Sequence, residues 1–171
     1  MTGRRLFFTS FILAGASFLT TLAMSAPGAL TQSWRTQDGW LTELRVHPNG
    51  ARVCSTGKVS QDPHQFVLTF VRSGPEAVVL LVDQKQPPAA SDTGDMTFTQ
   101  AGQTIGNVRT VVEGPAWSST DPNGPQAREL MTKLTDQALT IKVAGRQYQT
   151  QLNGLGDALA QLTRCNSGQA S

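Results

Sequence analysis

The chain's two cysteines, Cys54 and Cys165, are the residues with the clearest chemical potential. Their wide separation excludes the CxxC spacing of redox motifs and of many zinc sites. In an exported protein, two such cysteines typically form a disulfide. We therefore predict a Cys54–Cys165 bridge that ties the last helix of the domain to its first hairpin. Two reduced, buried thiols and a bridge between two molecules are the alternatives.

A glycine pattern at 154–159, GLGDAL, is similar to the start of a dinucleotide-binding fingerprint. It follows an expected strand and opens an expected helix. However, Leu159 occupies the third glycine position, where its side chain would prevent close packing of helix and strand. The chain also ends about a dozen residues later, too soon for a second βαβ strand. We interpret Gly154 and Gly156 as a turn and a helix start, and we expect no cofactor.

Other groups that could bind a metal or catalyse hydrolysis do not form a recognised motif. His47 and His64 have no ligand partner at short spacing, so no metal site is expected. Ser118 does not lie in a GxSxG sequence. Asp92 and Asp95 fall in a polar loop, where solvated carboxylates are expected. The chain is therefore predicted not to be an enzyme. A hydrolase whose catalytic residues meet only in space is an alternative.

Trp117, Ser118 and Asp121 are the candidate partner-binding residues. They fall in the segment 114–124, which is expected to be irregular because it contains glycines and prolines. An exposed tryptophan is a frequent anchor of protein interfaces. Packing of Trp117 in the core or at a sheet edge is the competing interpretation.

The N-terminus has the pattern of a secretory signal. Arg4 and Arg5 precede the mostly apolar stretch 6–24, and small residues follow it. We expect residues 1–25 to be a signal peptide that is cleaved after Ser25, which places the mature protein in the periplasm or the medium. The two arginines leave the general and the twin-arginine export routes open. An uncleaved membrane anchor is a further alternative.

Composition narrows the class of partner. The chain has 14 basic and 12 acidic side chains, and loss of Arg4 and Arg5 with the signal makes these numbers equal. A neutral mature domain lacks the excess of basic residues that attracts nucleic acids and anionic membranes. We expect no nucleic-acid partner and no stable membrane span after signal removal. The expected divisions are a poorly ordered lead-in at 26–39, a single β-rich domain at 40–166 and a disordered tail at 167–171.

Alternating apolar residues and turn signals predict a series of short strands. The turn at 48–50, Pro-Asn-Gly, is the strongest hairpin signal, because Asn and Gly tolerate positive φ. The expected strands are 40–47, 51–56, 66–72, 77–82, 96–100, 108–113, 139–143 and 147–152, with glycines at 102 and 106 joining the fifth to the sixth. The polar stretch 84–93 is expected to be the most flexible loop, and helices are expected at 125–136 and 156–163. This order predicts an α+β or mainly β fold, an antiparallel sheet or sandwich capped by two short C-terminal helices.

The stretch YQTQLNGLGDALAQL at 148–162 resembles the end of the invasion-associated locus B family of exported bacterial proteins. The positions that carry the resemblance are Leu152, Gly154, Ala158, Leu159 and Leu162, with Trp34 or Trp40 as a loose match to an early tryptophan. The chain departs from the family pattern because it has no cysteine soon after that tryptophan and no mid-chain cysteine pair. The resemblance implies a periplasmic, non-enzymatic protein linked to the envelope or to host interaction, and it brings no catalytic residues.

Together these features predict an exported periplasmic, β-rich binding or envelope-associated protein without catalytic activity. Its partner is expected to be a protein or an envelope component. An inhibitor of a secreted protease or lysozyme is an alternative, with the segment 114–124 as the inserted element. The hydrolase named above is the other alternative.

Overall fold

The structure is a computed structural model that describes residues 28–60, 65–120 and 125–169 of the 171-residue chain. The expected signal peptide, His64 and Asp121 therefore lie outside the described residues. Within these ranges, ten strands form one antiparallel sheet in the order β1-β2-β3-β4-β5-β8-β7-β6-β9-β10. The strands are β1 (Ala29–Arg35), β2 (Leu41–Val46), β3 (Arg52–Val59), β4 (Phe66–Ser73), β5 (Glu76–Asp83), β6 (Gly94–Gln100), β7 (Gln103–Glu113), β8 (Ala116–Ser119), β9 (Ala138–Val143) and β10 (Arg146–Gln151).

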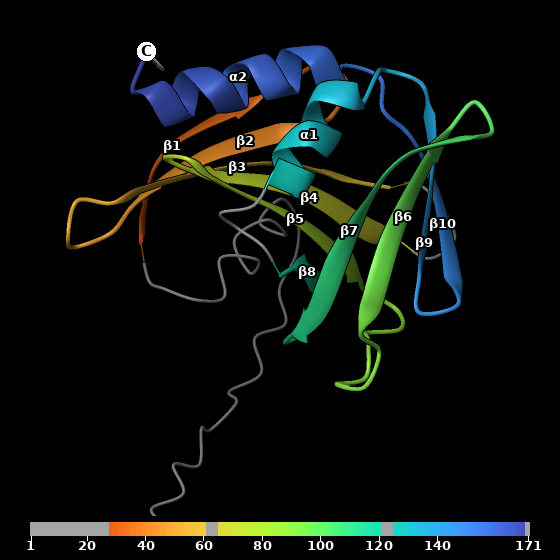
Figure 1. Cartoon of the computed structure of the whole chain (residues 1–171). Coiled ribbons are helices and arrows are strands. Elements are labelled where there is room, and N and C mark those ends of the chain that lie inside the picture. The colour runs from red at the N-terminus through yellow and green to blue at the C-terminus, as the bar shows by residue number, and fades with distance from the viewer. Residues whose placement is uncertain (1–27, 61–64, 121–124, 170–171) are drawn as a thin grey trace, which may run out of the picture.

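The sheet bends into two wings, the first made of β1–β5 and the second of β6–β10 (Figure 1). Two helices, α1 (Pro125–Lys133) and α2 (Leu155–Ser167), pack on it. Helix α2 lies against β2, β3 and β4, and α1 lies against β5 and β7. The predicted fold class, an antiparallel β-rich sheet capped by two short helices, is confirmed.

The core lies between the helices and the sheet, and large side chains at alternate strand positions fill it. Six aromatic side chains are fully buried there: Trp40, Phe66, Phe70, Phe98, Trp117 and Tyr148. Helix α2 contributes Leu155, Ala158 and Leu162, all buried and spaced at helical intervals. Burial of each leucine contributes roughly 1.5–3 kcal/mol. A 13-residue helix needs this contribution, because helices of that length are marginal in isolation.

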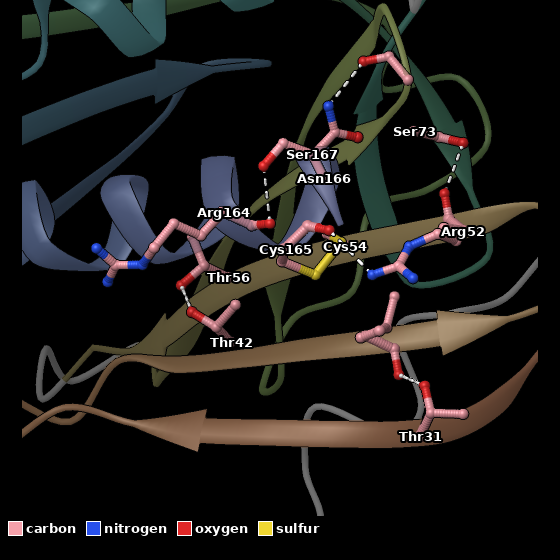
Figure 2. Close-up of a disulfide and its surroundings, with 12 residues drawn as sticks. Thr31, Thr42, Arg52, Cys54, Thr56, Ser73, Arg164, Cys165, Asn166 and Ser167 are labelled. Atoms are coloured by element: carbon pink, nitrogen blue, oxygen red, sulfur yellow. Dashed lines mark hydrogen bonds between the residues drawn. A yellow bond between two sulfur atoms is a disulfide. The ribbon is translucent and has the colours of Figure 1, made fainter. Parts of the chain in front are cut away.

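The predicted bridge is present: Cys54 of β3 and Cys165 of α2 form a disulfide with Sγ–Sγ 1.99 Å and Cα–Cα 6.0 Å. Both cysteines are fully buried, and Figure 2 shows the bridge between the underside of α2 and β3. Arg52 donates a hydrogen bond to the Cys165 carbonyl at 3.3 Å. Cys165 was expected just beyond the last helical turn, but α2 continues to Ser167 because Gly168 caps it at φ 79°. The bridge therefore holds the helix itself on the sheet.

Three segments differ from expectation. The lead-in 26–39 was expected to be poorly ordered, but residues 29–35 form edge strand β1, which pairs with β2. The segment 114–124 was expected to be irregular, but it contains β8, which lies between β5 and β7. Its serines are compatible with a buried strand because Ser119 Oγ accepts a hydrogen bond from the Val79 N–H at 3.1 Å. The third segment is 103–107, which was expected to join two strands but forms the first part of β7. Gly106 therefore lies inside this strand, where a Cβ atom would come within 3.1 Å of Leu130.

Candidate functional site

An open cavity of about 750 Å³ lies where the first wing of the sheet meets the far edge of the second. Its walls are the turn after β1, the end of β3, the start of β9 and the end of β10. Polar and apolar groups share this lining about equally, and the side chains that matter for recognition are Arg35, Asp38, Lys58, Gln149, Gln151 and Asn153. A volume of this size falls within the range of small-molecule sites, about 300–1,000 Å³.

Three hydrogen bonds join the two wings beside the cavity. The buried Trp40 indole Nε1 donates to the Asn153 carbonyl at 2.8 Å, and Lys58 Nζ donates to the same oxygen at 3.4 Å. Ser60 Oγ donates to the Gln149 carbonyl at 3.2 Å. These bonds connect residues about a hundred positions apart in sequence, so the shape of the cavity depends on the closed fold.

Lys58 is held in place without a carboxylate. Its ammonium lies 5.7 Å from the centre of the Trp40 ring, within the range of a cation–π contact, and it donates to the Asn153 carbonyl. None of the ion pairs among the described residues involves Lys58 or Arg35. The cavity wall therefore carries two cations whose charge is not neutralised by an ion pair.

Asp38 is the carboxylate of the cavity lining, and it packs against Gly154. A Cβ atom at position 154 would lie 2.5 Å from Asp38 Oδ2, and Gly154 has φ 76°. Both facts require glycine there. Gly154 is also the N-cap of α2, so the Asp38 carboxylate lies at the positive end of the helix dipole. The GLGDAL pattern is thus the turn and helix start expected from the sequence.

The far wall of the cavity is the end of β10. The β9–β10 hairpin turns through Ala144 at φ 48° and Gly145 at φ 75°, the backbone of a type I′ turn. Side chains alternate along β10, so Tyr148 is buried whereas Gln147, Gln149 and Gln151 are exposed. Only the latter two glutamines line the cavity. Their amide groups both donate and accept hydrogen bonds.

A second polar cluster lies in the interior, where Asp83 at the end of β5 is fully buried. Asp83 Oδ1 accepts from the backbone N–H groups of Lys85 and Gln86 at 3.0 and 2.8 Å. Its Oδ2 accepts from the Tyr148 hydroxyl at 3.0 Å, with Arg146 Nη1 3.7 Å away. Burial raises the pKa of Tyr148 from 10.0 to about 12. The tyrosine therefore keeps its proton to a higher pH than an exposed tyrosine, and its hydroxyl remains a hydrogen-bond donor to Asp83 in this buried network.

Arg146 extends this network to the loop 84–93. Its Nη2 lies 3.3 Å from Asp92 Oδ2, its guanidinium lies 5.1 Å from the centre of the Trp117 ring, and it donates to the Gln86 carbonyl. The loop expected to be the most flexible is thus attached to β10 at two points. Asp92 is thus the acidic partner of Arg146, whereas Asp95 is exposed on β6. The two carboxylates do not form a shared acid–base site.

The candidate partner-binding residues do not form a surface. Trp117 is fully buried and Ser118 is 4% exposed, because β8 has a neighbouring strand on each side. Trp117 Nε1 donates to the Asp92 carbonyl at 2.8 Å. The interpretation of Trp117 and Ser118 as partner anchors is therefore wrong, and Asp121 lies outside the described residues. Core packing, the competing interpretation of Trp117, is what the structure has.

The cavity residues were not identified from the sequence. Arg35 and Lys58 lie on separate strands, and Gln151 follows about ninety residues after Lys58. Their meeting depends on the bend of the sheet, for which no local pattern exists. Among the described residues there is also no group of three His, Cys, Asp or Glu side chains that could hold a metal ion.

Comparison with known proteins gives no relative: no family model, no curated protein and no solved structure matches the chain. Helices α1 and α2, with 9 and 13 residues, are shorter than the ~20 apolar residues that cross a bilayer.

Proposed function

We propose that the chain is an exported, periplasmic or secreted binding protein without catalytic activity, and that its ligand occupies the cavity between β3 and β10. The observation that carries this proposal is the cavity itself, with polar groups held in position by hydrogen bonds between the two wings. Preformed concave sites with a few oriented polar groups are the usual form of ligand sites.

Export is supported by two independent features. A disulfide persists in oxidising compartments and is rare in the cytosol, and this chain has one in its core. The pattern of residues 1–25 is that of a secretory signal. The resemblance of residues 148–162 to the invasion-associated locus B family supports an association with the envelope.

The lining supports binding more than catalysis. The ionisable side chains among the described lining residues are Arg35, Asp38 and Lys58. Asp38 packs on the start of α2, and Lys58 is held by a carbonyl and an aromatic ring. Neither is arranged with a second group as a nucleophile and base would be. The alternative of an enzyme inhibitor has less support, because the segment that was expected to insert into a target contains the buried strand β8.

A pair of matched variants tests the site. Gln151 and Gln147 are exposed on the same face of β10, but only Gln151 lines the cavity. We expect the wild type and Gln147→Trp to retain the same molecule from periplasmic extract, identified by mass spectrometry, and Gln151→Trp to lose it because the indole fills the cavity. Equal retention by both variants would place the binding site elsewhere. No retained molecule with any of the three proteins would contradict a binding function.

A further inference from the structure

The charges of the cavity favour an anionic ligand. Arg35 and Lys58 contribute two positive charges, and Asp38 contributes one negative charge that faces the start of α2. Neither cation has an ion-pair partner among the described residues. Two cations on one concave surface, with a single carboxylate beside them, create a net positive potential that attracts anions.

Lys58 is preorganised for this role. It is half-buried, and its ammonium is positioned by the Asn153 carbonyl and the Trp40 ring, neither of which carries a formal charge. A carboxylate that approaches it would form a charge-assisted hydrogen bond, which is about twice as strong as a neutral one. The carbonyl and the ring orient the ammonium before a ligand arrives, which lowers the side-chain entropy lost on binding.

The opposite wall matches a peptide backbone. Residues 143 and 146 flank the type I′ turn, and each donates its backbone N–H to the carbonyl of the other. Along the two strands, pairs bonded in this way alternate with pairs whose N–H and C=O groups point away from the partner strand. By this alternation the N–H and C=O of Gln151 point away from β9, as does the Gln149 carbonyl that Ser60 binds. Gln151 and Asn153 add amide side chains. The described lining contains no aromatic residue, so it lacks the stacking surface that nucleobases use.

We propose that the cavity binds a short acidic peptide segment, whose carboxylate pairs with Lys58 and Arg35 and whose backbone meets the amide groups at the end of β10. This inference rests on the proposed binding function and names its ligand class. A segment of a few residues suits the volume of about 750 Å³.

The test is calorimetric titration of the exported protein with two capped tetrapeptides, acetyl-Ala-Glu-Glu-Ala-amide and its Gln-Gln counterpart. We expect the acidic peptide to bind more tightly, and Lys58→Gln to weaken it about tenfold, the usual effect of losing one hydrogen bond to a charged group. Arg35 is exposed, so Arg35→Gln should weaken binding only about two- to fivefold. Lys142→Gln is the control, because this exposed lysine on β9 lies outside the cavity.

Asp38→Asn gives a result that misfolding cannot imitate. Removal of the negative charge from the lining should tighten binding of the acidic peptide, and added salt should weaken that binding. Unchanged or weaker binding by Asp38→Asn would overturn the inference. So would equal affinity for the two peptides, or tighter binding of a uronic acid trisaccharide than of the acidic peptide. If these outcomes occur while Gln151→Trp still loses the retained molecule, the binding function stands and only the ligand class is wrong.

Discussion

Tyr148 permits a direct test of the interior network, because it is the only tyrosine in the chain. Its ring is fully buried against Phe66 and Trp117, and its hydroxyl donates to Asp83 Oδ2 at 3.0 Å. Loss of the proton would place a phenolate beside a carboxylate, away from water. Burial is the largest cause of the raised pKa of about 12, and the neighbouring Asp83 acts in the same direction, whereas Arg146 opposes it.

The size of the effect on stability follows from this shift. The pKa rises from 10.0 to about 12 on folding, and each pH unit corresponds to about 1.36 kcal/mol, so the maximum is about 2.7 kcal/mol. The unfolded chain loses the proton first as the pH rises. Tyr148 therefore contributes its full stabilisation below pH ~10, and this contribution is lost as the pH rises to ~12.

Tyrosinate absorbance in the near ultraviolet gives the pKa directly in folded protein, with the denatured chain as an internal reference. Denaturant unfolding at several alkaline pH values then gives the free energy of unfolding for the wild type and for Tyr148→Phe. Other groups titrate in this range in both proteins, so the difference between the two pH slopes isolates Tyr148. A tyrosine that ionises near pH 10 in the folded protein would refute the burial of the phenol and its bond to Asp83.

Three other predictions concern the bridge, the start of α2 and export. Cys165→Ser should lower the free energy of unfolding by roughly 2–5 kcal/mol and increase protease sensitivity beyond Gly154, because the bridge closes a span of 111 residues. Free thiols or a linked dimer in non-reducing peptide maps of the natural protein would contradict the intramolecular bridge. Gly154→Ala should lower the free energy of unfolding more than Gly168→Ala does in parallel denaturation curves. Both glycines have φ near 80°, where an alanine lowers stability by roughly 1 kcal/mol, but only position 154 adds a clash with Asp38. Equal losses in the two variants would show that Asp38 moves away freely. Intact-mass measurement of the exported protein should find a chain that begins at Ala26, and retention of residues 1–25 would contradict cleavage after Ser25.

The parts of the fold that could be predicted are those with local signals. The Pro-Asn-Gly turn at 48–50, the apolar strands β4 and β5 and the apolar face of α2 all follow from patterns within a dozen residues. The disulfide could also be predicted, because only two cysteines were available. These features do not depend on how the sheet bends.

The missed parts depend on distant partners. Strand β1 has mostly exposed side chains and exists because β2 offers its edge. Strand β8 is short and half serine, and its burial depends on strands on both sides of it and on the Ser119 bond to Val79. The cavity was missed for the same reason, since Arg35, Lys58 and Gln151 meet only after the wings close. Trp117 was a candidate partner anchor, with core packing as the competing interpretation, because its neighbours in sequence suggested a loop.

The bond between Trp40 and Asn153 has a consequence for the time course of folding. It joins residues 113 positions apart, and the lysine contact with the same carbonyl spans 95. Contacts of such high sequence separation form late and slow the folding reaction, because the entropy of closing a long loop must be overcome first. We therefore expect ligand affinity to appear in the slowest refolding phase, together with closure of the disulfide-linked helix on the sheet.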